Sequence, residues 1–453
     1  MKKKLAMLLI TAMLFGLTSC GKDGEMSSAG EDQDNPLVPQ VNTSVDEPGD
    51  DVADISFMWW GGTVREERTQ AALDLYHSNN PGVTFEMESV AWSDYKNELE
   101  NKHNSNSLPD IAQIDYSFLD SSVNNGMLVD LTPYLADGTL DLSGVDPGLI
   151  SAGSVNGKVY AVCAGVNVPT LMYNKTLLDE LEIEIKDNMT MEEFYEVARQ
   201  VYEKSGVKTD IAHGTSYNYL PYIMRAKDIT KLFNHNSLNV SSAADFEDFF
   251  SIYETGVSEG WIMGNDVYTD LVDGSVDKNP LVLYTTPETQ SWCAFFWSNQ
   301  LTTLTNEAPE GVEIGITTWP SYDPAKSDFL KPAMFFSVTA GAGENEEAAV
   351  RVINYLLNSQ PANELMLAER GIPASAAVAA AIAPLLDQNG QTVTTFINDV
   401  VTPNSSNVSP SDPEAATLVY SYTDELVSKI LGGQMTAAEA AQELFEQGNK
   451  LMQ

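Results

Sequence analysis

Aromatic and acidic side chains end three successive segments of the chain that have the composition of short strands. Trp59 and Trp60 end the first segment, Trp92 ends the second, and Asp115 with Tyr116 follow the third. An aromatic ring can stack on a flat apolar face of a ligand, and a carboxylate can accept hydrogen bonds from its polar groups. This pattern therefore indicates a binding site built from stacking and hydrogen bonds.

The elements that must position these residues alternate between strand and helix. Residues 54–62, 83–92 and 110–115 are apolar or alternating runs typical of strands, whereas residues 65–82 and 93–105 have helical spacing. Strands that alternate with helices predict a parallel sheet, in which ligands bind outside the carboxyl ends of the strands. We therefore expect the three aromatic-bearing ends to share one edge of a sheet. Later segments, at 190–206, 245–261 and 436–452, are predicted helices.

The amino-terminal residues predict export and lipid attachment. Residues 2–4 are lysines, and residues 5–17 form an apolar run shorter than the roughly 20 residues that span a membrane. The run leads into Leu-Thr-Ser-Cys, which resembles the bacterial lipobox, so residues 1–19 are expected to be a lipoprotein signal peptide and Cys20 the lipidated residue. A plain secretory signal with an incidental cysteine is the alternative. The acidic residues 20–51 should form a disordered tether.

Length, charge and cysteine content narrow the class of protein. The 453 residues are enough for two or more domains. With 65 acidic and 24 basic residues the net charge is −41, which repels phosphate backbones, so no nucleic-acid partner is expected. Cys163 and Cys293 are expected to be buried free thiols, although nothing in the sequence forbids their pairing.

Several stretches, taken in order, resemble a known family. They are SLPDIAQID at 107–115, GMLVDLTPYL at 126–135, NGKVYAVCAGVNVPTLMYNKTLLDEL at 156–181, SVTAGAGENEEAAVRVINYLLNSQ at 337–360 and RGIPAS at 370–375. The series resembles family 1 extracellular solute-binding proteins, the lipid-tethered receptors of bacterial sugar ABC transporters. WWGGTVREERTQAALDLY at 59–76 is similar to the branch that takes oligosaccharides. Cys163 departs from the pattern, because a proline is usual there, and leaves the hinge geometry open.

The resemblance implies an α/β fold of the type II periplasmic-binding-protein kind, with two lobes joined by crossing hinge strands. The N-terminal α/β lobe is expected to use residues 52–163 and 320–374. A helix-rich C-terminal lobe is expected to use residues 167–312 and 378–453. Hinges near 164–166, 314–319 and 375–377 would let the lobes close around a ligand.

The resemblance also implies a carbohydrate ligand, and the residue types suit one. The C–H face of a pyranose can stack on a ring, and its hydroxyls need polar partners, because an unpaired buried hydroxyl costs about 1–3 kcal/mol. Several tryptophans favour an oligosaccharide. Because side chains alternate along a strand, at most one of Trp59 and Trp60 can face the ligand. Trp297 is expected to pack in the core. The expected ligand-binding residues are Trp59, Trp60, Trp92, Asp115, Tyr116, Asn167, Tyr217, Glu288, Trp292 and Trp319.

The implied function is that of a lipid-anchored, extracytoplasmic and monomeric binding protein that delivers an oligosaccharide to the permease subunits of an ABC importer. The chain has no nucleotide-binding loop, and no cofactor or metal is expected. The alternatives are a cell-surface glycoside hydrolase, which needs paired carboxylates, and a glycan-binding lipoprotein without a transport role. Residues 256–260 match the Gly-x-Ser-x-Gly of a hydrolase elbow, but a helix precedes them where a strand is required, so a helix-ending turn is expected. We therefore do not expect an enzyme.

Overall fold

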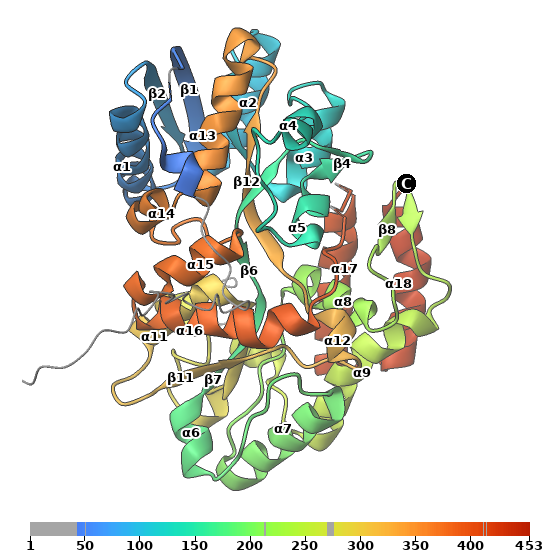
Figure 1. Ribbon diagram of the computed structural model, residues 1–453. Helices are drawn as coiled ribbons and strands as arrows, with labels where there is room; N and C mark the ends of the chain where they lie inside the picture. Colours follow the sequence, from blue (N-terminus) through green and yellow to red (C-terminus); the bar gives the residue numbers. More distant parts are fainter. Residues whose placement is uncertain (1–42, 50, 213, 270–275, 411, 414) are drawn as a thin grey trace, which may run out of the picture. The chain divides into compact units, whose positions relative to one another are not determined.

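The computed structural model describes residues 43–49, 51–212, 214–269, 276–410, 412–413 and 415–453 (Figure 1). These residues belong to one unit of the chain, Pro39–Gln453. The expected signal peptide and Cys20 lie outside the described residues, as does most of the expected tether.

The larger sheet contains strands in the order β13-β6-β12-β3-β1-β2. They are β1 (Ala53–Trp60), β2 (Val83–Val90), β3 (Ile111–Ile114), β6 (Val162–Asn167), β12 (Lys331–Val338) and β13 (Ile372–Pro373). β1 runs parallel to β2 and β3, which confirms the parallel sheet predicted from the alternating segments. β12 runs antiparallel to both β3 and β6. A strand between parallel neighbours is covered on both faces, and β1 accordingly buries Ile55, Phe57 and Met58.

Helices cover this sheet and join its parallel strands. They are α1 (Thr63–Asn79), α2 (Trp92–Asn104), α3 (Tyr116–Asn124), α5 (Pro147–Ala152), α13 (Glu346–Asn358) and α14 (Gln360–Met366). α1 and α2 confirm the two helices predicted between the first strands. α1 packs against α13 and α14, whereas α3 and α5 pack against β12.

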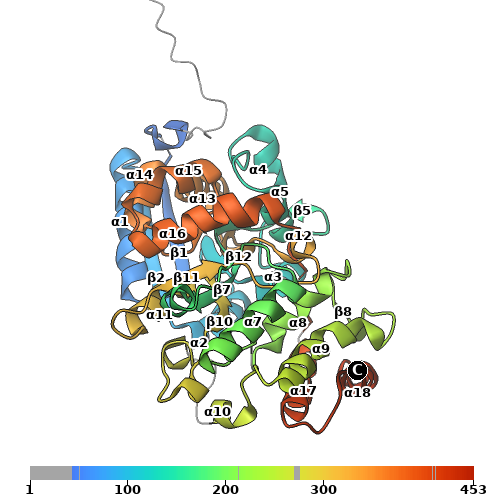
Figure 2. The same cartoon turned by 90° about the horizontal axis from the view of Figure 1, so that it is seen from below.

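The smaller sheet is antiparallel, in the order β10-β7-β11, and consists of β7 (Pro169–Asn174), β10 (Cys293–Trp297) and β11 (Ile314–Thr317). Six helices contribute residues to the buried cluster that β7 and β10 also join: α6 (Lys175–Glu180), α7 (Met191–Ser205), α8 (Ser216–Arg225), α9 (Ala244–Glu259), α17 (Ala416–Leu431) and α18 (Ala437–Leu451). α9, α17 and α18 pack on one another (Figure 2). α7, α9 and α18 confirm the three later helices, and capping boxes start α7 and α18 as predicted.

The described chain also contains shorter helices and two hairpins. The helices are α4 (Thr132–Asp137), α10 (Asn265–Thr269), α11 (Leu301–Glu307), α12 (Pro324–Ser327), α15 (Ala376–Ile382) and α16 (Gln388–Phe396). Two hairpins pair β4 (Ser154–Val155) with β5 (Lys158–Val159) and β8 (Phe233–Asn234) with β9 (Ser237–Leu238).

Buried apolar side chains form two clusters, and the chain crosses between them. Val168, after β6, belongs to the first cluster, and Leu171, on β7, belongs to the second. Trp319, after β11, belongs to the second cluster, and Leu330, before β12, belongs to the first. Buried residues of α15 and α16 join the first cluster and those of α17 and α18 the second. The residue boundaries expected for the lobes and hinges stay predictions.

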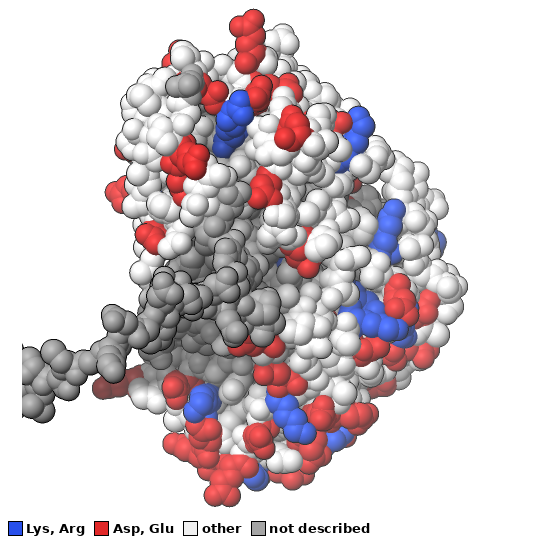
Figure 3. Space-filling model, in the orientation of Figure 1, with Lys and Arg blue, Asp and Glu red and all other residues white. Residues whose placement is uncertain are grey.

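Two further expectations concern cysteines and surface charge. Cys163 and Cys293 are free and buried, which confirms the expected thiols. Asp and Glu outnumber Lys and Arg on the face shown in Figure 3, and basic side chains form ion pairs such as Arg199–Glu259 at 2.7 Å. In the part of the chain that the structure describes, no helix has the length and apolar character needed to cross a membrane.

Candidate functional site

The carboxyl ends of β1, β2 and β3 meet at one edge of the larger sheet, where three helices begin. Trp60 lies opposite Val90 in the register of β1 with β2, and Met58 lies opposite Ala112 in that of β1 with β3. Because α1, α2 and α3 start directly after these strands, their first residues gather at the same edge. We call it the carboxyl-end edge.

An aromatic cluster lies at this edge. The ring of Trp60 is 5.0 Å from that of Trp92 and 5.0 Å from that of Tyr95, and Phe118 lies 6.5 Å from both tryptophans. Trp60 is 8% exposed, whereas Trp92 is 54% exposed. The cluster therefore holds one exposed indole, that of Trp92, in place from behind. Trp59 points into the core, 1% exposed and 5.1 Å from Phe57.

Asp115 and Tyr116 form the start of α3. The Asp115 carboxylate accepts hydrogen bonds from the Ser117 amide at 2.9 Å and the Ser117 hydroxyl at 2.6 Å, which caps the helix. The Tyr116 ring lies 6.0 Å from that of Phe335 on β12, and its hydroxyl donates to the Ser409 carbonyl. Burial raises the pKa of Tyr116, so this hydroxyl stays protonated and keeps donating.

Two cations lie on aromatic rings beside this edge. Lys331 begins β12 opposite Asn167 on β6, and its Nζ lies 4.7 Å from the centre of the Trp297 ring. That ring is 6.1 Å from Phe329, over which the Arg225 guanidinium lies at 4.5 Å. Neither cation forms an ion pair within the described residues. Burial lowers the pKa of Lys331, and the charge of Asp115 partly offsets the shift.

A short segment at residues 406–409 accepts hydrogen bonds from a side chain of each buried cluster's helices, Tyr116 on α3 and Arg225 on α8. Arg225, on α8, donates to the Ser409 hydroxyl at 2.5 Å, to the Ser406 hydroxyl at 2.6 Å and to the Asn407 carbonyl. Tyr116, on α3, reaches the same segment through the Ser409 carbonyl. This arrangement places side chains of α3 and α8 on a common piece of backbone.

The other predicted site residues lie apart from this group. Trp292 is fully buried, donates from Nε1 to the Thr209 hydroxyl at 2.8 Å, and stacks near Phe194. Trp319 is 1% exposed and packs among rings of the second cluster. Neither indole offers a surface to a ligand in this conformation. Tyr217 is exposed at the start of α8.

Glu288 is exposed in a 3-10 turn, where hydrogen bonding from Thr286 lowers the pKa of its carboxyl.

Of the predicted site residues, the structure brings together Trp60, Trp92, Asp115, Tyr116 and Asn167 along one side of the larger sheet. Whether they bind ligand stays a prediction.

Lys331, Trp297 and Arg225 were not in the predicted site. Trp297 packs against the second cluster as expected, but only in part, and its half-buried ring carries the Lys331 ammonium. A single lysine that opens an otherwise apolar strand is the one signal in the sequence that points to this group. Nothing in the sequence connects it with a tryptophan 34 positions away or with Arg225 on a helix.

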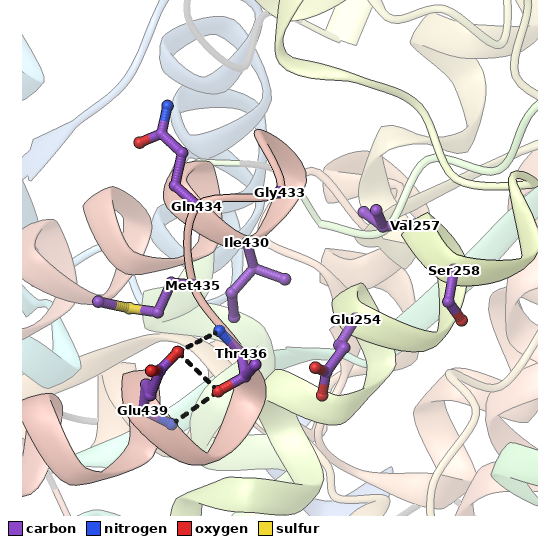
Figure 4. A pocket seen from close by; sticks show the side chains of 9 residues that line it. All are labelled: Glu254, Val257, Ser258, Ile430, Gly433, Gln434, Met435, Thr436 and Glu439. Carbon is purple, nitrogen blue, oxygen red and sulfur yellow. Dashed lines mark hydrogen bonds between the residues drawn. The ribbon is translucent and has the colours of Figure 1, made fainter.

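A surface pocket of about 310 Å³ opens elsewhere, between α9 and the turn that joins α17 to α18 (Figure 4). Its acidic side chains are already engaged. Glu254 accepts from the Ala437 amide at 3.2 Å, and Glu439 accepts from the Thr436 amide at 2.9 Å. Both carboxylates therefore cap α18, and we do not assign the pocket to the site.

The enzyme motif weighed above does not form an elbow. Ser258 lies in the last turn of α9, its hydroxyl donates to the Thr255 carbonyl at 2.9 Å, and Gly260 ends the helix in the left-handed conformation. The expected helix-ending turn is confirmed. Within the described ranges, no group of three or more His, Cys, Asp or Glu side chains is arranged to hold a metal ion.

The larger sheet has the strand order β2-β1-β3, followed by the antiparallel strand β12. A second, smaller sheet is present, and the chain crosses between two buried clusters. These features define a two-lobed α/β binding protein of the periplasmic-binding-protein-like fold. The family model for bacterial extracellular solute-binding proteins matches residues 71–393, and the chain belongs to this family. The expected fold class and family are thereby confirmed. The family is one of extracellular proteins, which agrees with the expected location outside the cytoplasm.

One curated protein is similar in sequence to about half of the chain. A carbohydrate ABC transporter substrate-binding protein of Streptococcus pneumoniae serotype 4 (strain ATCC BAA-334 / TIGR4) is 26% identical over 244 residues, which are 50% of this chain and 46% of that protein. The match therefore spans about half the length of this relative.

Two solved structures share the fold. An extracellular solute-binding protein family 1 from Alicyclobacillus acidocaldarius subsp. acidocaldarius DSM 446 has a TM-score of 0.76 at 18% identity, over 89% of this chain and 100% of that chain. A periplasmic oligogalacturonide binding protein from Yersinia enterocolitica has a TM-score of 0.72 at 19% identity, over 88% of this chain and 99% of that chain.

Proposed function

We propose that this protein is the lipid-anchored receptor of a carbohydrate ABC importer, and that it binds an oligosaccharide at the carboxyl-end edge and delivers it to the permease. The observation that carries the proposal is the Trp92 indole, exposed at this edge and held by Trp60 and Phe118. An exposed aromatic ring that is fixed from behind is suited to stack on a sugar without losing side-chain freedom. The family, and a relative named for carbohydrate transport, support the transport role.

Polar side chains at the carboxyl ends of β3 and β6 suit the rim of a sugar. Asp115 keeps acceptor capacity beyond the hydrogen bonds that cap α3, and Asn167 offers both an acceptor and donors. Lys331 lies opposite Asn167 in the strand register, its ammonium lies over the Trp297 ring, and the charge of Asp115 acts on it. In this proposal, Trp92 stacks on one ring of the oligosaccharide and these side chains bond its hydroxyls. Trp59, Tyr217, Glu288, Trp292 and Trp319 stay predicted contacts.

We infer that the protein does not transform its ligand and acts as a monomer. Capture needs only the binding groups above, and ATP hydrolysis would belong to a separate subunit. Cys20 would carry the lipid, and the acidic segment after it would give the receptor reach. Two acyl chains are enough for stable anchoring, whereas one is marginal.

Isothermal titration calorimetry of the purified protein against a panel of oligosaccharides tests the binding role, with product analysis on the same samples. We expect saturable one-to-one binding and no shorter sugars. Steady appearance of shorter sugars would contradict the receptor function and favour a glycoside hydrolase. If the protein binds a sugar but uptake of that sugar does not depend on a cognate permease, the result would favour the glycan-binding lipoprotein.

The anchor has its own test. Cys20→Ser should move the protein from the membrane fraction to the soluble fraction and abolish labelling by a radioactive fatty acid. Cys163→Ser is the matched control, because that thiol is buried and should leave both readouts unchanged. Unchanged fractionation of Cys20→Ser would overturn the lipid assignment.

A further inference from the structure

Lys331 carries a positive charge that no polar group of the described chain engages. The residue is half-buried, and its Nζ forms neither a hydrogen bond nor an ion pair with any described residue. Its ammonium lies 4.7 Å from the centre of the Trp297 ring, a contact that favours the charged form. Lys208 lies over the Tyr202 ring in a similar way, but it also donates to the Gly260 carbonyl. Lys331 thus keeps its three N–H donors for a ligand or for water.

The strand register places Lys331 beyond the end of β3. Phe335, on β12, lies opposite Ile114, the last residue of β3, and opposite Cys163 on β6. Nearer the start of β12, Lys331 lies opposite Asn167 on β6 and has no partner on β3. β12 therefore continues past the point where β3 ends, and Lys331 belongs to the same side of the sheet as the predicted sugar contacts.

Aromatic packing fixes the position of this ammonium. The Trp297 ring on which it lies is 6.1 Å from the Phe329 ring and 5.6 Å from the Trp319 ring. Trp319 is fully buried in the second cluster, so the support comes from that cluster, although Lys331 itself extends from the larger sheet. A lysine held in this way loses less side-chain freedom when it binds a ligand than a free surface lysine does.

The nearby carboxylate does not pair with this charge. The charge of Asp115 acts on Lys331, but the two groups form no ion pair, and the Asp115 carboxylate accepts two hydrogen bonds from Ser117. A ligand that covers the carboxyl-end edge would remove the remaining water from the ammonium. A neutral sugar hydroxyl would accept a hydrogen bond there but would leave the charge unbalanced. An anionic group would accept the same bond and balance the charge.

We propose that the oligosaccharide bound at the carboxyl-end edge is anionic, and that Lys331 selects it by binding one singly charged group, a carboxylate or a sulfate ester. This assignment rests on the proposed function, because it names the class of sugar that the same site takes. A phosphate monoester suits the site less well, since it carries about −1.5 to −2 charge at neutral pH and one ammonium balances a single charge. The net charge of −41 repels anions at long range, but salt screens that field over about 8 Å, so direct contact decides the preference.

Calorimetry of the purified protein with matched pairs of sugars tests the proposal. Di- and trisaccharides of galacturonate and of glucuronate are each compared with their carboxyl-reduced, neutral forms, and neutral disaccharides are compared with their 6-sulfated forms. We expect an acidic sugar to bind roughly 10- to 100-fold more tightly than its neutral counterpart, which is the usual contribution of a hydrogen bond to a charged group. The series in which this preference appears identifies the anionic group as a carboxylate or a sulfate ester.

Substitution of Lys331 assigns the preference to its ammonium. Lys331→Gln removes the charge and should lose most of the preference, with a much smaller loss of affinity for the neutral sugar, whereas Lys331→Arg should retain the preference. Lys326→Gln is the matched control. It removes the same charge from α12, but that ammonium is already paired with Asp228 at 2.8 Å, so this variant should keep the preference.

The possible failures of this inference and of the proposed function are distinguishable. Neutral sugars that bind as tightly as their acidic counterparts would leave the oligosaccharide receptor in place and overturn the anionic ligand. That comparison uses the wild-type protein, so it remains decisive if Lys331→Gln does not fold. A preference that survives in a folded Lys331→Gln would overturn the role of Lys331. If no sugar of either kind binds, the proposed function fails together with this inference.

Discussion

Truncation of Trp92 to alanine separates the candidate site from the rest of the surface. Trp92 is the most exposed aromatic residue of the cluster at the carboxyl-end edge, and the neighbouring rings hold it in place. The change removes the exposed ring but leaves Trp60 and the backbone of α2. It should weaken oligosaccharide binding far more than it weakens the fold.

The expected loss follows from the exposed area. A tryptophan presents up to ~250 Å², and Trp92 is 54% exposed, which corresponds to about 135 Å² available to a ligand. At about 25 cal/mol per Å², covering all of this area stabilises the complex by about 3.4 kcal/mol, and covering half of it by about 1.7 kcal/mol. The dissociation constant of Trp92→Ala should therefore rise roughly 20- to 300-fold.

Calorimetry with the best ligand of the panel measures the change, and circular dichroism with thermal unfolding confirms that the variant is folded. Trp92→Phe keeps a ring and should lose less affinity. Leu418→Ala is the control, because Leu418 has a similar exposure of 55% on α17, away from the site. If Trp92→Ala is folded and binds as tightly as the wild type, the carboxyl-end edge is not where the ligand stacks.

Three further predictions concern stability and reactivity. Burial raises the pKa of Asp328 to about 7, above its value in the unfolded chain, so the folded state binds the extra proton. Stability should then fall by roughly 1.4 kcal/mol per pH unit from about pH 4 to about pH 7 and level off above. Asp328→Asn should remove this part of the pH dependence in urea titrations, and equal slopes for both proteins would contradict it. Thr190→Ala deletes half of the capping box with Glu193 and should cost about 1 kcal/mol in the same titrations; a change indistinguishable from zero would show that the cap is not needed. Burial raises the pKa of Cys163 to about 12 and that of Cys293 well above the usual value, so a thiol reagent should label neither until the protein unfolds, and rapid labelling of the native protein would argue against their burial.

The sequence was sufficient for the elements that local rules determine. The alternation of strand-like and helical segments predicted β1, β2 and β3, because strands that are joined through helices most often form a parallel sheet. Thr190 and Thr436 predicted the starts of α7 and α18, because a capping box involves only four consecutive residues. The lobes and the crossing strands came from the family resemblance alone, since β12 joins β3 and β6 across more than a hundred residues.

The exposure of single aromatic residues could not be predicted in the same way. Trp92 and Trp292 both follow or begin strand-like segments, yet one is half exposed and the other fully buried. The difference arises from what covers them. Phe194 on α7 and the Thr209 hydroxyl reach Trp292 from distant parts of the chain, whereas the described residues leave Trp92 54% exposed. Burial is thus a property of tertiary packing that the local sequence does not record.

The hydrogen bonds that Tyr116 and Arg225 donate to residues 406–409 have a consequence for the order in which the contacts of this protein form. Tyr116 and Ser409 are 293 positions apart, and Arg225 and Ser409 are 184 positions apart. Contacts of such sequence separation form late, because the chain must first close long loops. During synthesis and export, neither residue finds its partner until nine tenths of the chain has emerged. The junction between α3 and α8 is therefore completed only in a nearly full-length chain, and a copy truncated before residue 406 lacks it.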